Sequence, residues 1–262
     1  MSFPSTIAGL NELPADQKRE TYSKIIPPQL LDMYQVSPDL RDQDGRDLFH
    51  LDCDPGTADA ELALFHQIDA PDPIIFGHLA DTIHGQIHIL LYGMNDVSSP
   101  RFNIDRMPDG SKTNFGINQR NLAEERRALE AGLAPGQIYR GPHLFKESLQ
   151  QFERFVDCMG QKLFFVEPLF YHVAIIFERY HFRYQQGKRL IKRIEEGFSA
   201  NGDLLPLLDG STPFRDPEAA DQVRLRSWAI HDNILGEPFN KVTMYKFIDL
   251  EETPCKDPSL PW

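Results

Sequence analysis

The stretch that decides the fold begins at Gln137-Ile138-Tyr139-Arg140-Gly141-Pro142 and continues through residues 143–182. After this turn, the spacing predicts an amphipathic helix over residues 143–159, because apolar side chains recur four and three residues apart. These side chains are Phe145, Leu149, Phe152, Val156 and Met159. Gly160 suits the end of that helix. A glycine turn that leads into a helix N-terminus can hold a phosphate group, so the stretch predicts both a fold unit and a candidate phosphate site.

The second half of the stretch predicts a strand, a helix and a further strand. Residues 163–166 are apolar at every position, which is typical of a central strand buried on both faces. Pro168 is expected to open the next helix, where its missing N–H costs nothing. Residues 169–177 are nearly all apolar and predict a largely buried helix, and residues 182–184 are β-prone.

The rest of the chain adds strands before this unit and loops after it. Short β-prone runs separated by turn residues predict strands over 48–53, 60–66, 74–80 and 86–94, and two late ones over 222–228 and 241–248. Further helices are expected over 121–131 and 187–197. The fold class is therefore α/β of the α+β type, with a mixed, largely antiparallel central sheet flanked by helices. We expect an N-terminal arm (1–45), an α/β core domain (46–199) and a C-terminal extension packed on the core (200–262).

Composition limits the classes of function. The 262 residues carry a formal net charge of −12, which disfavours nucleic-acid binding. Cys53, Cys158 and Cys255 are far apart and form no CxxC motif, so reduced thiols and a cytoplasmic location are expected. The first residues do not resemble a signal peptide, and no apolar run approaches the ~20 residues of a membrane span. We expect a small-molecule substrate and no membrane partner. A homo-oligomer remains open.

The order turn, helix, strand, helix resembles the core of the GCN5-related N-acetyltransferase superfamily over about 50 residues. In that family a Gln/Arg-x-x-Gly-x-Gly/Ala turn precedes the helix, and its backbone N–H groups hold the pyrophosphate of acetyl-CoA. Residues 137–143 partly resemble this turn. The run Phe177-Glu178-Arg179-Tyr180-His181-Phe182 looks like the family's Tyr-Glu-Arg-Leu-Gly-Phe ending.

The resemblance implies the acyl-CoA N-acyltransferase fold, acetyl-CoA or another acyl-CoA as cofactor, and acyl transfer to a small amine. It places the cofactor-binding residues at Gln137, Tyr139, Arg140, Gly141, His143 and Leu144. The chain departs from the family where Pro142 removes one N–H and His143 replaces a small residue. Phe177 also replaces the tyrosine that often protonates the leaving thiolate. A non-catalytic member of the fold, which binds a small molecule or a partner, is therefore an open alternative.

Histidines around residue 84 give the candidate base. If residues 84–92 form one strand, His84 and His88 share a face with Tyr92. Either imidazole could act as general base, because its pKa lies near neutrality. Glu167, at the end of the predicted buried strand, is a second candidate, because burial would raise its pKa.

A second alternative is a non-haem di-metal oxygenase that uses two carboxylate-x-x-His pairs. The pairs are Asp81/His84 and Glu178/His181, and they resemble the inward ligands of ferritin-like proteins. This alternative needs residues 74–94 to be helical, whereas their isoleucines and glycines favour strand. On a strand, His84 and His88 would lie about 13 Å apart, too far to share a metal ion. We therefore expect no metal site.

Overall fold

The computed structural model describes residues 3–116, 119–248 and 261–262, which form a mixed α/β fold. Seven strands form one open, mostly antiparallel sheet in the order β1-β2-β3-β4-β5-β7-β6. The chain divides into two compact units. The first unit comprises residues 1–98, 141–167 and 246–250, and the second comprises 99–140, 168–245 and 251–262. The expected arm lies wholly in the first unit, and the expected core segment contributes to both.

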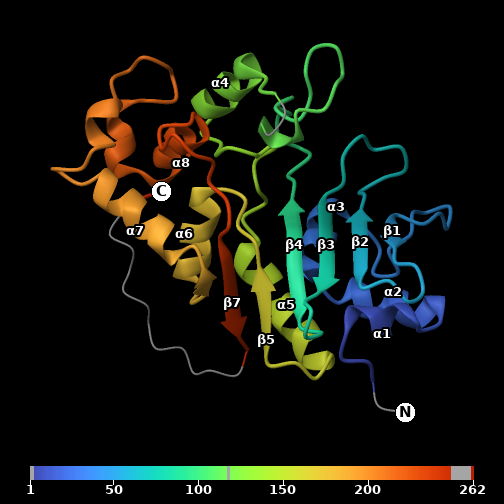
Figure 1. The fold of residues 1–262 in the computed structure, drawn as a ribbon. Helices are drawn as coiled ribbons and strands as arrows, with labels where there is room; N and C mark the ends of the chain where they lie inside the picture. The colour runs from blue at the N-terminus through green and yellow to red at the C-terminus, as the bar shows by residue number, and fades with distance from the viewer. Residues whose placement is uncertain (1–2, 117–118, 249–260) are drawn as a thin grey trace. The chain divides into compact units, whose positions relative to one another are not determined.

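The first unit contains the strands that the sequence predicts before residue 98, followed by the buried strand of the opening stretch (Figure 1). These are β1 (Phe49–Asp52), β2 (Asp59–Leu64), β3 (Ile75–Asp81), β4 (Ile87–Met94) and β5 (Leu163–Val166). Strands β1 to β4 pair antiparallel with their sequence neighbours, and β5 pairs parallel with β4. The prediction of a mixed, largely antiparallel sheet is confirmed.

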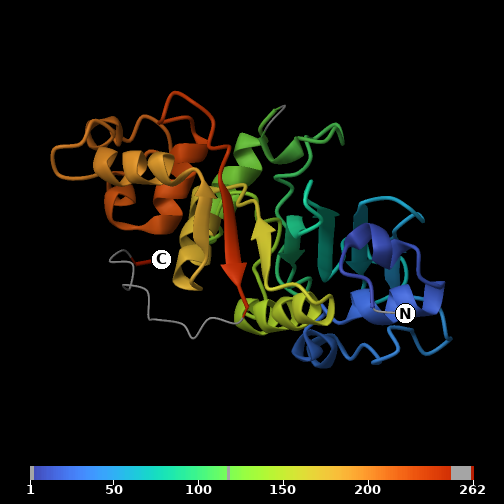
Figure 2. The ribbon, with the colours of Figure 1, turned by 60° about the horizontal axis from the view of Figure 1, so that its bottom comes forward.

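Helices cover one face of this sheet. They are α1 (Ile7–Asn11), α2 (Ala15–Ser23), α3 (Pro28–Tyr34) and α5 (Phe145–Cys158). Figure 2 shows α5 and the blue N-terminal helices in front of the strands. The carboxylate of Asp81 at the end of β3 accepts hydrogen bonds from the backbone N–H groups of Ile7 (2.7 Å) and Ala8 (2.8 Å), which joins α1 to the sheet. Tyr22 of α2 stacks on Phe155 of α5 within the same layer.

A β-bulge in β4 places Tyr92 on the opposite face of the sheet from the one that the sequence predicts. The register with β3 shifts at this point, so that Leu79 faces Ile89 while His78 faces Leu91. One extra residue on β4 reverses the alternation of its side chains. Tyr92 therefore lies on the helix-covered face, where its ring packs edge-on against Phe152 of α5 at 4.8 Å. The prediction that His88 and Tyr92 share a face is wrong, because the period of two is interrupted between them.

Strand β1 is one of the two outer strands of the sheet, and α2 covers its outer edge. Lys18 Nζ donates a hydrogen bond to the carbonyl of Cys53 (3.0 Å). Arg19 Nη1 donates another to the carbonyl of Phe49 (3.3 Å). The carbonyls of Phe49 and Cys53 point away from β2, because only every second carbonyl along β1 pairs with β2. Lys18 and Arg19 therefore bind the edge of β1 that has no neighbouring strand.

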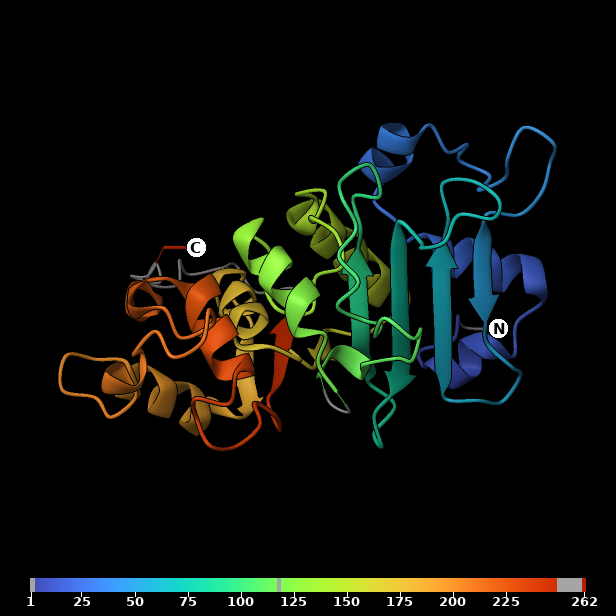
Figure 3. The same cartoon turned by 90° about the horizontal axis from the view of Figure 1, so that it is seen from above.

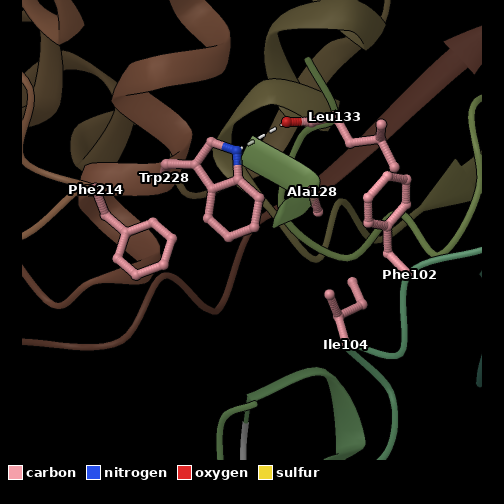
Figure 4. Packing of buried hydrophobic residues seen from close by; sticks show 6 residues of the cluster. All are labelled: Phe102, Ile104, Ala128, Leu133, Phe214 and Trp228. Carbon is pink, nitrogen blue, oxygen red and sulfur yellow. Dashed lines mark hydrogen bonds between the residues drawn. The ribbon is translucent and has the colours of Figure 1, made fainter. Parts of the chain in front are cut away.

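The second unit is mainly helical. It contains α4 (Leu122–Glu130), α6 (Tyr171–Arg179), α7 (Lys188–Gly197), α8 (Val223–His231) and β6 (Arg183–Gln186), and β7 (Thr243–Phe247) spans the boundary with the first unit. Its core surrounds Trp228, whose ring is fully buried and stacks on Phe214 at 5.2 Å (Figure 4). The indole N–H donates to the carbonyl of Leu133 (2.8 Å), so the one polar atom of the ring is satisfied.

Two secondary-structure predictions are wrong in this unit. The sequence predicts a strand over residues 222–228 from a short β-prone run between turn residues, but residues 223–231 form α8. Most of α8 is buried, where a helix satisfies its backbone hydrogen bonds internally. A short β-prone run does not reveal this environment. Pro168 does not open a helix either, since α6 begins at Tyr171.

Candidate functional site

The parallel pair β4 and β5 opens into a fork. In the register between these strands, His88 pairs with Phe165 and Ile89 pairs with Val166. The next hydrogen bond joins the Glu167 N–H to the Ile89 carbonyl (3.3 Å), whereas β4 continues to Met94. The bulge lies directly after Ile89, so the strands separate where the register of β4 changes. A fork of this kind leaves backbone groups of β4 available to an extended ligand.

His88 and Glu167, two of the predicted catalytic residues, meet at the base of the fork. His88 Nε2 lies 3.4 Å from Glu167 Oε1, and the His88 side chain is 16 % exposed. The two atoms lack hydrogen-bond geometry, and Nε2 has no hydrogen-bond partner among the described residues. Burial lowers the pKa of His88, and the Glu167 carboxylate opposes this only in part. The imidazole is therefore neutral at pH 7 and can accept a proton.

The N-terminus of α5 lies against the open part of β4. Tyr92 and Ser148 are hydrogen-bonded hydroxyls, and Ser148 belongs to the first turns of α5. The N-cap residue of α5, Leu144, provides no side-chain hydrogen bond to the first turn. The helix dipole and the backbone N–H groups of the first turn of α5 favour an anion at the N-terminus of this helix. Sequence reasoning missed the link between Tyr92 and Ser148, because the bulge that turns Tyr92 toward α5 has no signature in the sequence.

The predicted cofactor-binding turn is divided between the two units. Gly141, His143 and Leu144 lie in the first unit. His143 has a left-handed backbone (φ 60°) and an exposed side chain directly before the helix. A Cβ added to Gly141 would meet no described atom within 4 Å, so there is open space beside it.

The other three predicted residues lie in the second unit and bind their own loop. The side-chain oxygen of Gln137 accepts a hydrogen bond from the Ala134 N–H (2.7 Å). The Arg140 guanidinium donates to the Ala131 carbonyl (3.0 Å), and Tyr139 is buried.

The remaining predicted site residues lie apart from the fork. His84 lies in the exposed turn between β3 and β4, so it is not on a strand as expected, because Gly85 (φ 74°) helps to reverse the chain there. Residues 74–94 are two strands and a turn, so Asp81 and His84 do not share the helix face that the di-metal alternative needs. No group of three or more His, Cys, Asp or Glu side chains within the described ranges could hold a metal ion. Cys255 lies outside those ranges.

The second unit holds a buried ionic network that the sequence did not reveal. Glu125, on α4, accepts hydrogen bonds from Arg120 Nε (2.9 Å) and lies 3.2 Å from His231 Nε2. Arg120 also contacts Asp232 (2.9 Å), which accepts from Arg215 as well (3.1 Å). Burial alone would raise the pKa of Glu125, but the hydrogen bonds from His231 and Arg120 outweigh it and hold the pKa below its usual range. Every member has a partner inside the network, so we interpret it as structural.

Two further findings concern the class of protein to which the chain could belong. No helix in the described part of the chain is both long and apolar enough to cross a membrane. No protein-family model matches the chain, and no curated protein or solved structure is significantly similar to it. Function therefore has to be argued from the fork and its surroundings.

Proposed function

We propose that this chain is an acyl-CoA-dependent N-acyltransferase-like protein that acts on a small amine. The observation that carries the proposal is the fork between β4 and β5, with a neutral imidazole at its base and an uncapped helix N-terminus beside it. The coarse architecture, a mixed and largely antiparallel sheet with helices, is also the one that the resemblance implies.

Each part of the fork has a role in this proposal. The first turn of α5, with Gly141 and His143 before it, holds the pyrophosphate through backbone N–H groups. The backbone groups in the open part of β4 would hold the pantetheine arm by hydrogen bonds. The acyl-CoA supplies the acyl group as a thioester. His88 lies at the base of the fork, where that thioester ends.

The ammonium nitrogen loses two protons on its way to the amide, one to His88 before attack and one to solvent after it. His88 takes a proton from the ammonium form of the amine, and the amine nitrogen then bonds to the acyl carbon while the C–S bond breaks. The thiolate leaves with the electron pair of that bond. Phe177 offers no proton at the family's usual position, so solvent protonates the thiolate, which a thiol pKa of about 8.5 allows. Glu167 stabilises the imidazolium that forms.

Calorimetry with acetyl-CoA tests the proposal directly. We expect binding with a dissociation constant below about 1 mM, and His88→Gln should bind equally well but lose about 100-fold or more in acyl transfer. Absence of binding at that concentration would refute the proposal. Glu147→Gln, in the first turn of α5, is a useful comparison, because loss of a negative charge near the pyrophosphate should strengthen binding.

A non-catalytic member of the same fold is the second candidate. Phe177 favours it, because a phenyl ring cannot protonate the leaving group. Acyl-CoA binding without turnover of any amine tested, in both the parent protein and His88→Gln, would select this candidate over the enzyme.

A further inference from the structure

A cavity in the first unit lies away from the fork. It has a volume of about 670 Å³, within the range of small-molecule sites. It is lined by the loop that follows α3 and by the loop between β2 and β3. Figure 3 shows both loops at one end of the strands. The two loops are joined by the hydrogen bond from the Phe65 N–H to the Leu48 carbonyl (3.0 Å), so the cavity has a fixed base.

Four of the charged groups that line this cavity, Asp39, Arg41, Asp42 and Arg46, already have partners, whereas the exposed Asp69 has no hydrogen-bond or ion-pair partner among the described residues. Arg46 pairs with Asp42 (2.7 Å) and Asp44 (2.9 Å). Arg41 Nη1 donates to the carbonyl of Gly45 (2.8 Å), and the Arg41 N–H donates to Asp39 (3.2 Å). A strongly charged ligand would have to compete with these contacts, so the cavity does not favour one.

Several neutral polar side chains that line the cavity have no hydrogen-bond partners among the described residues. The side-chain amides of Gln35, Gln43 and Gln67 line the cavity, are exposed, and make no hydrogen bond to another described residue, so a ligand can hydrogen-bond to them in place of solvent. His66 also lines it, and its Nδ1 is buried without a hydrogen-bond partner in the described part of the chain. Burial lowers the pKa of His66, so the ring is neutral at pH 7. A buried polar atom without a partner is costly and indicates a group that is supplied from outside.

We propose that this cavity binds a neutral, polyhydroxylated ligand of the saccharide class. Each amide both donates and accepts, as does each hydroxyl of a sugar, so adjacent hydroxyls match Gln43 and Gln67 without any net charge. Ile68, which lines the cavity and is partly exposed, supplies apolar surface for the C–H face of a sugar ring. A nucleobase fits less well, because His66 is the only aromatic ring among the lining residues and it already packs on Tyr34 at 5.8 Å.

Saturation-transfer NMR on the full chain tests this site with glucose, mannose, N-acetylglucosamine, maltose and adenosine as probes. We expect transfer to at least one of the sugars at about 10 mM and none to adenosine. Gln67→Ala and Gln43→Ala should each weaken the sugar about fivefold, the loss of roughly one neutral hydrogen bond. Gln150→Ala, an exposed glutamine on α5, is the matched control and should leave binding unchanged.

Three results would overturn the proposal: no transfer to any sugar, transfer to adenosine alone, or sugar binding that Gln67→Ala and Gln43→Ala leave unaltered. His66→Phe retains the ring against Tyr34 and removes Nδ1, so it should also weaken the sugar. Circular dichroism of each variant establishes that it is folded. Because Gln43 and Gln67 are exposed, their variants keep the test decisive even where His66→Phe does not fold.

Discussion

Glu125→Gln is expected to destabilise the second unit far more than an ordinary change of a surface carboxylate. The Glu125 side chain is 3 % exposed and contacts both Arg120 and His231. The network contains two guanidinium groups and two carboxylates, so replacing the buried Glu125 carboxylate leaves one partly buried positive charge without compensation. Breaking a buried ion pair in this way costs about 3–5 kcal/mol of unfolding free energy.

The matched control is Glu130→Gln on the same helix. Glu130 pairs with Arg126 (2.8 Å), but both side chains are about 60 % exposed. Exposed pairs contribute at most about 1 kcal/mol, so this variant should unfold almost as the parent does. The comparison separates burial from the simple loss of a charge on α4.

Tryptophan fluorescence during urea unfolding reports this unit specifically. The chain has two tryptophans, and both Trp228 and Trp262 belong to the second unit. The urea midpoint of Glu125→Gln should fall well below that of Glu130→Gln. Equal midpoints for the two variants would refute the assignment of the network as a structural element of the unit.

The contribution of Glu125 to the unfolding free energy changes with pH in a defined direction. Because the pKa of Glu125 is held below its ordinary value of 4.5, its contribution to stability is complete above that pH. The contribution is lost as the pH falls through the lower, folded-state pKa. The difference in unfolding free energy between the parent and Glu125→Gln should therefore shrink as the pH falls below 4.5. A difference that stays constant down to pH ~2 would contradict the pairing.

Three further outcomes are expected from the first unit. Because burial lowers the pKa of His88, the rise of kcat/KM with pH should have its midpoint below the ordinary 6.5, and His88→Gln should abolish that rise. Tyr92→Phe leaves the buried Ser148 hydroxyl without this partner, so chemical denaturation should show a loss of about 1–3 kcal/mol. Gly93→Ala places a Cβ in steric conflict with the Phe76 ring, and thermal unfolding should show a loss of about 1–3 kcal/mol; an unchanged melting temperature would mean that the ring moves aside freely.

Local patterns in the sequence predicted most of the elements. Turn residues separated the strands before residue 98 correctly, and the spacing of apolar residues located α5 to within two residues at its start. Residues 163–166 form β5, as predicted from their continuous apolar run. These signals succeed because each depends on neighbours within a few positions of the chain.

The features that the sequence missed depend on distant partners. The bulge after Ile89 arises from the register with β3, so the period of two in β4 gave no sign that Tyr92 turns toward α5. Glu125 and His231 are 106 positions apart, and neither lies in a recognisable motif. The β-prone run 222–228 predicts a strand where α8 forms, because local composition cannot show that most of the segment is buried.

The bonds from α2 to the outer edge of β1 have a consequence for how the protein behaves at high concentration. An uncovered edge strand can pair with a strand of another molecule and begin aggregation. Lys18 and Arg19 occupy carbonyls at both ends of that edge, and an incoming strand would need those carbonyls as acceptors. The two side chains therefore act as a barrier to intermolecular sheet growth, and neutralising both would convert a closed edge into a template for fibre formation.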